Sequence, residues 1–107
     1  MIGTLSDRER HHFAPTGYLE LGVGPGQTAQ IPASDIPGGQ VLAVIHYAGG
    51  PFRFRVDGAD PSLTNGWPAE DGDTDDCNRF EAMNWRACLA QGATSGTIRV
   101  GLYRRVD

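Results

Sequence analysis

The segment from Phe52 to Gly66 constrains the fold of this chain more than any other part of the sequence. Its first five residues read Phe-Arg-Phe-Arg-Val, so apolar and charged side chains alternate with a period of two. This alternation is typical of a β-strand with one buried and one solvated face. The turn pairs Asp57-Gly58, Asp60-Pro61 and Asn65-Gly66 follow at once and end the strand sharply. A short strand followed by dense turns predicts a compact all-β domain.

Other short apolar or alternating runs are separated by turn residues along the whole chain, which has 15 glycines and seven prolines. The run at 41–47 is almost continuously apolar and predicts a central strand buried on both faces. Residues 34–39 predict a loop that can contain one helical turn. The expected strands are 18–23, 28–31, 41–47, 52–56, 77–81, 84–89 and 97–103. Seven short strands without a long helical pattern predict an antiparallel β-sandwich, jelly-roll-like.

The first 17 residues show neither helical nor strand periodicity, and they end at Pro15-Thr16-Gly17. They predict an extended N-terminal arm, which is either a loose terminus or a segment that becomes ordered against a partner. The full length of 107 residues is enough for one domain with a modest core. The sequence therefore divides into an arm at 1–17 and a β-sandwich domain at 18–107.

Charge and hydropathy narrow the partners that we expect. The net charge of −4 disfavours direct binding to nucleic acid, which prefers a basic patch. No apolar run approaches the roughly 20 residues of a membrane span, and the N-terminus lacks an apolar signal region. All nine basic residues are arginine. This bias reflects either genome composition or selection for forked cations at protein interfaces. We expect a protein made in the cytosol that contacts no membrane.

The order of sequence features resembles a family of small bacteriophage virion proteins. In such proteins a strand of the form x-Arg-Tyr/Phe-Arg precedes an Asp-Gly-x-x-Pro-Thr-x-x-x-Gly stretch, and here Ser62 stands in place of the threonine. The resemblance covers residues 28–103, roughly three quarters of the chain. The matching features are the apolar strand 41–48, Gly49-Gly50, the strand 52–55, the segment 57–62, Gly66-Trp67-Pro68, Gly72-Asp73, the segment 83–87 and the strand 98–103.

This resemblance implies a β-sandwich that is a structural part of a virion, without fixing its place in the head, tail or fibre. It implies no catalytic residues, and the sequence contains no nucleophile elbow, no His-Glu-x-x-His and no phosphate loop. We therefore expect a protein that is not an enzyme and needs no cofactor.

Two clusters suggest metal or redox chemistry, and each has a simpler interpretation. The acidic loop at 70–76 fails the EF-hand pattern at positions 6 and 12, which leaves a solvated loop or a calcium site built from several loops.

A hairpin turning at Ala82-Met83 would place Cys77 opposite Cys88 and Phe80 opposite Trp85. The cysteines are then two reduced core residues or a disulfide formed after release from the cell. We expect no metal, and a hydrogen-bonded strand histidine at position 46.

The remaining candidates are interface residues. The two arginines of the strand 52–56 share one face, which is either a solvated polar face or a patch that docks an acidic surface. The tryptophan that precedes Pro68 lies in an expected loop, as an exposed anchor or as a core residue. With the basic end of the arm, the candidate interface residues are Arg8, Arg10, His11, His12, Arg53, Arg55 and Trp67.

From these features we predict a non-enzymatic capsid cement or decoration protein, located in the virion. Its expected partners are the major capsid protein or another virion protein, and further copies of itself. The arm would lie along neighbouring subunits. Two alternatives stay open: a small tail, fibre or baseplate component, and a carbohydrate-binding β-sandwich.

Overall fold

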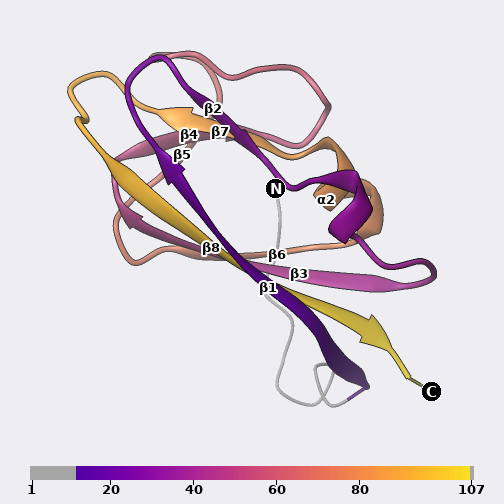
Figure 1. Ribbon diagram of the computed structural model, residues 1–107. Helices are drawn as coiled ribbons and strands as arrows, with labels where there is room; N and C mark the ends of the chain where they lie inside the picture. The colour runs from indigo at the N-terminus through magenta and orange to yellow at the C-terminus, as the bar shows by residue number, and fades with distance from the viewer. Residues whose placement is uncertain (1–11, 107) are drawn as a thin grey trace.

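A computed structural model describes residues 12–106, which form two four-stranded antiparallel sheets (Figure 1). One sheet has the order β1-β8-β3-β6, and the other has the order β2-β7-β4-β5. The mostly-β prediction with antiparallel pairing is confirmed. In chain order the elements are β1 (Phe13–Val23), β2 (Thr28–Gln30), the 3-10 turn η1 (Ala33–Asp35), β3 (Val41–Gly49), β4 (Phe52–Arg55), β5 (Trp67–Ala69), β6 (Thr74–Cys77), α2 (Arg79–Asn84), β7 (Arg86–Leu89) and β8 (Gly96–Arg105).

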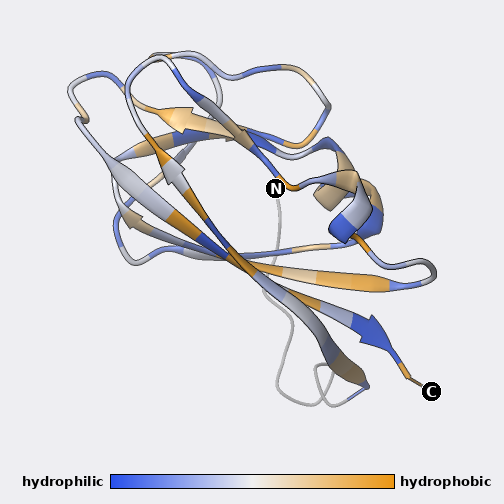
Figure 2. Cartoon of the chain, in the orientation of Figure 1, coloured by the Kyte–Doolittle hydropathy of each residue, from blue (hydrophilic) through white to orange (hydrophobic). Residues whose placement is uncertain are grey.

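The inner faces of the two sheets share one hydrophobic core. From β3, the side chains of Ala43, Ile45 and Tyr47 are completely buried, and Ile98 and Val100 of β8 join them. Hydrophobic colours predominate along β3 (Figure 2). The prediction that this strand is buried on both faces is only partly correct. On its outer face Leu42 is buried, whereas Val44, His46 and Ala48 are half-buried, because the outer face of a two-layer domain borders solvent.

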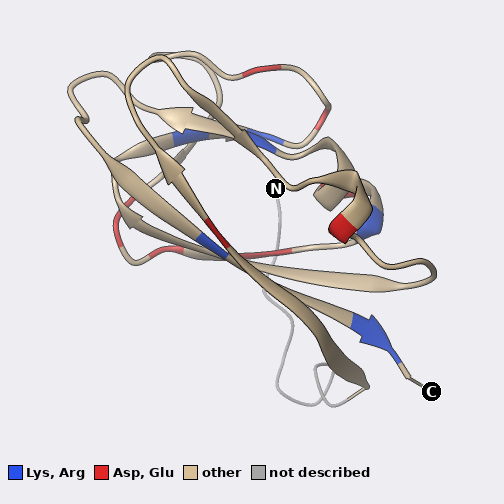
Figure 3. Ribbon diagram, viewed as in Figure 1, with Lys and Arg blue, Asp and Glu red and all other residues tan. Residues whose placement is uncertain are grey.

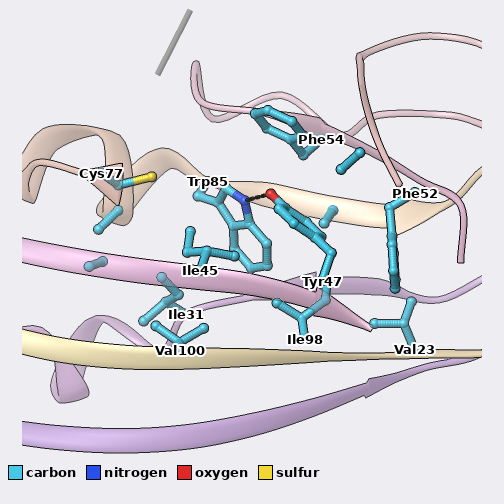
Figure 4. Packing of buried hydrophobic residues seen from close by; sticks show 14 of the residues in the cluster. Val23, Ile31, Ile45, Tyr47, Phe52, Phe54, Cys77, Trp85, Ile98 and Val100 are labelled. Atoms are coloured by element: carbon cyan, nitrogen blue, oxygen red, sulfur yellow. Dashed lines mark hydrogen bonds between the residues drawn. The ribbon is translucent and has the colours of Figure 1, made fainter. Parts of the chain in front are cut away.

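Aromatic side chains fill the centre of this core (Figure 4). The ring of Tyr47 lies 5.5 Å from the ring of Phe52 and 5.8 Å from that of Phe54, measured between centroids. Both separations lie within the range over which aromatic rings attract each other. Because Tyr47 belongs to β3 and the phenylalanines to β4, these contacts hold the two sheets together.

The alternation in β4 is confirmed. Phe52 and Phe54 point into the core, and Arg53 and Arg55 point to the other face of the sheet. The turns after β4 bring the chain back at Gly66, whose backbone has φ of +131°. A Cβ atom there would lie 3.0 Å from the carbonyl oxygen of Phe54 and 3.2 Å from Pro61. Glycine is therefore required for β5 to pair beside β4.

The predicted strand 77–81 and the hairpin that follows it are wrong, whereas the predicted strand 84–89 is confirmed from Arg86 to Leu89, as β7. The short helix α2 occupies the middle of this region. Asn78 caps it by accepting a hydrogen bond from the Glu81 amide, and the Glu81 side chain accepts one from the Asn78 amide. This capping box, with Ala82 buried beneath it, favours a helix over a strand.

The predicted aromatic pair of this hairpin is also wrong. Phe80 is 72% exposed on α2, whereas Trp85 is completely buried after the helix ends. Cys77 lies in β6 of one sheet, and Cys88 lies in β7 of the other. A helix and a change of sheet therefore separate the two cysteines.

The expected arm is too long at its C-terminal end. Residues 13–17 belong to β1, which pairs with β8 from the Phe13–Arg105 pair onward, with an irregularity between Pro15 and Gly17. Proline is tolerated there because β1 is an edge strand. The hydroxyl of Thr16 donates to the Leu102 carbonyl at 3.1 Å and fits the irregularity. Residues 1–11, which hold the rest of the expected arm, lie outside the described residues.

Candidate functional site

Three arginines share the outer face of the sheet β2-β7-β4-β5. Arg53 and Arg55 come from β4, and Arg86 comes from β7, where it lies directly across from Arg55. Figure 3 shows basic residues on these two strands. We call these three arginines the arginine face. Trp67 of the neighbouring strand β5 pairs with the inward-facing Phe54, so the register places it on the other side of the sheet, at the edge strand. The incorrectly predicted hairpin gave no indication that Arg86 belongs to this face. The signal for its true position was the inward Trp85 directly before it.

The guanidinium groups of this face are held in place by nearby loops. Arg53 Nη1 donates to the Gly66 carbonyl at 3.3 Å. Arg86 Nη1 donates to the Trp85 carbonyl at 2.8 Å and to the Met83 carbonyl at 3.3 Å. The arginines therefore order the turn before β5 and the end of α2. Such pre-ordering lowers the entropy cost of binding a partner.

Arg55 is paired with a carboxylate on the same side of the sheet. Its Nε donates to Asp57 Oδ1 at 3.0 Å and its Nη2 donates to Oδ2 at 2.5 Å, so the pair is bidentate. Hydrogen bonding to Arg55 lowers the pKa of the Asp57 carboxyl, and the same bonds raise the pKa of the guanidinium. The Asp57 side chain is exposed and the Arg55 side chain is partly exposed, so the pair orients the side chains more than it stabilises the fold. The net positive charge of the face comes from Arg53 and Arg86.

Trp67 is 50% exposed, and it begins β5 instead of lying in a loop as expected. Beside it is a pocket of about 380 Å³ whose wall includes the Arg55–Asp57 pair, Asn65 and Gly66. The pocket therefore combines one aromatic ring with charged and amide groups. Arginine and tryptophan are the residue types most enriched among the side chains that dominate protein interfaces.

The other predicted interface residues do not join this face. His12 lies at the start of β1 in the other sheet, where its carbonyl accepts a hydrogen bond from the Val106 amide at 2.9 Å. Arg8, Arg10 and His11 lie outside the described residues. The structure thus places Arg53 and Arg55 on one face together with Arg86, brings Trp67 beside Arg55 at the pocket, and separates them from His12.

The acidic loop uses its carboxylates to shape a turn. Asp71 Oδ1 accepts a hydrogen bond from the Gly49 amide at 2.8 Å, and Asp73 Oδ2 accepts one from the Glu70 amide at 2.8 Å. Within residues 12–106, no group of three or more His, Cys, Asp and Glu side chains is placed to hold a metal ion. This geometry corresponds to the solvated-loop interpretation.

Both cysteines are free and buried. Burial raises the pKa of the Cys77 thiol and of the Cys88 thiol, so neither is poised as a nucleophile at neutral pH. His46 Nδ1 lies 3.3 Å from the hydroxyl of Thr74, which confirms the prediction of a hydrogen-bonded strand histidine.

Comparisons of the chain with protein families, with curated proteins and with solved structures found no match. In the part of the chain that the structure describes, no helix has the length and hydropathy needed to cross a membrane.

Proposed function

We propose that this protein is a non-enzymatic structural component of a bacteriophage virion, a cement or decoration protein that binds the assembled capsid shell. The strand order supports the proposal. The two four-stranded sheets, β1-β8-β3-β6 and β2-β7-β4-β5, support a jelly-roll-like sandwich as part of this proposal. Viral capsid domains and lectins commonly use that fold. The resemblance of residues 28–103 to small phage virion proteins points the same way.

The docking surface in this proposal is the arginine face. Arg53 and Arg86 supply positive charge, and the half-exposed Trp67 lies on the adjoining edge strand, beside Arg55. This combination suits an acidic surface on the major capsid protein, on another virion protein or on a second copy of the chain. A protein that binds only the assembled shell shifts the assembly equilibrium toward the shell. Many copies on a symmetric lattice multiply modest contacts.

The decisive experiment compares virions that carry the protein with virions from which it has been stripped. We expect stripped particles to lose their DNA at lower temperature and after milder osmotic shock, and we expect purified protein to restore them. Gold-labelled antibody should decorate the head in electron micrographs. Equal stability of stripped and complete particles would exclude the cement role. Label confined to the tail would favour the tail, fibre or baseplate alternative.

Paired substitutions test the arginine face itself. We expect Arg53→Ser with Arg55→Ser to fold with an unchanged circular dichroism spectrum and to lose most of its incorporation into virions. A side chain that dominates an interface contributes about 2 kcal/mol or more, which is roughly a 30-fold loss of affinity. The matched control is Arg99→Ser with Arg104→Ser, which removes the same charge from exposed positions on β8 of the other sheet. If both variants incorporate equally, the docking surface lies elsewhere.

The Trp67 pocket favours carbohydrate binding as the second candidate function. A tryptophan ring beside an Arg–Asp pair and the Asn65 amide can stack on a sugar ring and bond its hydroxyls. The chain offers only a short platform for an extended glycan, because its other tryptophan, Trp85, is completely buried. A glycan array with multivalent protein tests this candidate, and Trp67→Ala should abolish any signal.

A further inference from the structure

The edge strands of the two sheets differ in how they are protected from further pairing. The edges are β1 and β6 of one sheet and β2 and β5 of the other. β2 and β5 have only three residues each, and β5 contains Pro68. β6 has four residues, and its Asp75 lies across from the buried Ile45, which places a charge on the inner face of an edge strand. Short edges, prolines and inward charges all block pairing with another chain. β1, with 11 residues, is the long exception.

Only the first part of β1 carries such a protective device. Pro15 and the irregularity that follows it interrupt the strand near its start. The remaining segment, residues 18–23, contains one charged residue, Glu20, and neither lysine nor proline. Leu19 and Leu21 of this segment are half-buried and pack against the core from its margin. Residues 18–23 are therefore an open and largely apolar strand edge, which we call the β1 edge.

The backbone groups of alternate residues point outward from the β1 edge. The Arg105 amide at the end of β8 donates to the Gln40 carbonyl, beside β3. The Leu102 carbonyl of β8 accepts from the Thr16 hydroxyl of β1. Because an antiparallel strand bonds its two neighbours in alternation, odd-numbered residues of β8 bond β3 and even-numbered ones bond β1. The β1 residues across from odd-numbered positions thus direct their N–H and C=O groups away from the sheet. They are Tyr18, Glu20 and Gly22. Within residues 12–106, no strand pairs with β1 on that side.

The β1 edge is complementary to a second copy of itself in one antiparallel register. With a two-fold axis at Leu19, Tyr18 of each copy lies opposite Glu20 of the other. Both are outward residues, so they form the kind of pair that exchanges its N–H···O bonds. On the inner side, Leu19 meets its own counterpart, and Leu21 lies opposite Gly17, which leaves room for the leucine side chain.

Neighbouring registers are less favourable. An axis at Glu20 would set two carboxylates directly opposite each other. An axis at Tyr18 would bring the irregular backbone between Pro15 and Gly17 opposite Glu20. The register centred on Leu19 avoids both conflicts.

The polar side chains on the outer side are already arranged for this pairing. Glu20 Oε1 accepts hydrogen bonds from the Tyr18 hydroxyl at 2.8 Å and from Arg99 Nε at 3.2 Å. These bonds lower the pKa of the Glu20 carboxyl, so it is an ionised acceptor at neutral pH. Among residues 12–106, no hydrogen bond reaches its Oε2, which is left for a donor from a second copy. The Tyr18 ring is 63% exposed and would be covered there.

We propose that the β1 edge is the interface between two copies of this chain, which pair antiparallel about Leu19 and join their β1-β8-β3-β6 sheets into one continuous sheet. In strand addition the main-chain hydrogen bonds supply affinity, and the alternate side chains supply specificity. A two-fold interface uses the same patch on both copies, so assembly closes at a dimer. The dimer also removes the long unprotected edge. This proposal does not depend on a role in a virion.

Opposite charges at one exposed position test the interface in the full-length chain. Sedimentation equilibrium should show a dimer. Tyr18→Glu puts a carboxylate across from Glu20 of the second copy, and we expect it to weaken the dimer about tenfold, because the two-fold axis repeats each repulsive pair. Tyr18→Lys puts an ammonium group there and should dimerise at least as well as the original chain. A chain that stays monomeric at its highest soluble concentration would overturn the proposal, and so would equal dimerisation of the two variants.

Cysteine substitutions test the register. In the proposed pair the Cα atoms of Leu19 and its counterpart lie about 4.5 Å apart, a separation that a disulfide can bridge. We expect Leu19→Cys to give a cross-linked dimer under mild oxidation, whereas Cys77 and Cys88 are buried and should take no part. The matched control is Leu21→Cys, also half-buried, whose counterpart is displaced by about 13 Å along the strand. Cross-linking of both variants, of neither, or of the control alone would overturn the proposed pairing.

Discussion

The indole N–H of Trp85 donates a hydrogen bond of 3.2 Å to the hydroxyl of Tyr47 at the centre of the core (Figure 4). Tyr47 belongs to β3 of one sheet, and Trp85 directly precedes β7 of the other. Both side chains are completely buried. The indole N–H and the hydroxyl therefore satisfy each other in place of the water that they contact in the unfolded chain. This bond ties the end of α2 to the central strand of the opposite sheet.

Replacing Tyr47 by phenylalanine should destabilise the fold through the partner that it leaves behind. The buried Trp85 N–H would lose its acceptor, which costs about 1–3 kcal/mol of unfolding free energy. The control is Tyr103→Phe at a half-buried position, where we expect a change within about 0.5 kcal/mol. Urea unfolding followed by tryptophan fluorescence measures both. Equal losses in the two variants would contradict the structural role of the bond.

Stability should fall at alkaline pH in two stages. Burial raises the pKa of the Cys77 thiol and, separately, that of the Tyr47 hydroxyl, so the native state keeps protons that the unfolded chain releases. Their stabilising contribution is complete below the unfolded pKa values of about 8.5 and 10, and it is lost as pH rises beyond them. We expect the unfolding free energy to decline above about pH 8.5 and more steeply above about pH 10. Cys77→Ala should remove part of the first decline, and Tyr47→Phe should remove the second. A profile that stays flat to pH 11 would be inconsistent with the burial of these groups.

Two glycines on paired strands should respond differently to alanine. A Cβ atom at Gly96 would lie 2.2 Å from the buried ring of Phe52, whereas one at Gly22 meets nothing within 4 Å. Gly96→Ala should therefore cost about 1–3 kcal/mol through overpacking. Gly22→Ala should be neutral or slightly stabilising, because glycine weakens a strand. Thermal unfolding of the two variants measures both effects. Similar melting temperatures would show that Phe52 can move aside.

The capping box of α2 can be tested at one residue. Asn78→Ala removes the side chain that accepts from the Glu81 amide, and we expect a loss of about 1 kcal/mol. Asn78→Asp keeps an acceptor there and should stay close to the original stability. Chemical denaturation gives both values. If aspartate destabilises as much as alanine, then the helix does not depend on this cap.

The two cysteines should resist both pairing and modification in the native protein. They lie on different sheets, and the Cys77 side chain is part of the core, so an intramolecular disulfide would require unfolding. We expect mild oxidant to leave both thiols free and a maleimide to react fully only in denaturant. Cys88, 9% exposed on the outer face, should react before Cys77, which is 1% exposed. Rapid disulfide formation detected by mass spectrometry in native protein would refute this arrangement.

Local patterns in the sequence predicted the long and strongly patterned strands. The alternation in β4 separates Phe52 and Phe54 from Arg53 and Arg55 without help from the rest of the chain, because side chains of a strand alternate between its faces. The continuous apolar run of β3 and the alternation in β8 are equally local. Glycine and proline marked the turns between these strands, because the backbone preferences of these two residues are also local. The helical turn η1 (Ala33–Asp35) overlaps the start of the predicted loop at 34–39.

Tertiary structure decided the features that depend on distant residues. The segment around Ala82 is too short for its periodicity to separate helix from strand, and burial against the core together with the capping box selected α2. β1 begins at Phe13 because β8 offers backbone groups to pair with, which no local pattern at residues 13–17 announces. Strand order is likewise a property of the whole chain. By itself the sequence placed Arg53 and Arg55 on one face. Only the pairing of β4 with β7 brought Arg86 beside them, since register depends on contacts between strands rather than on either strand alone.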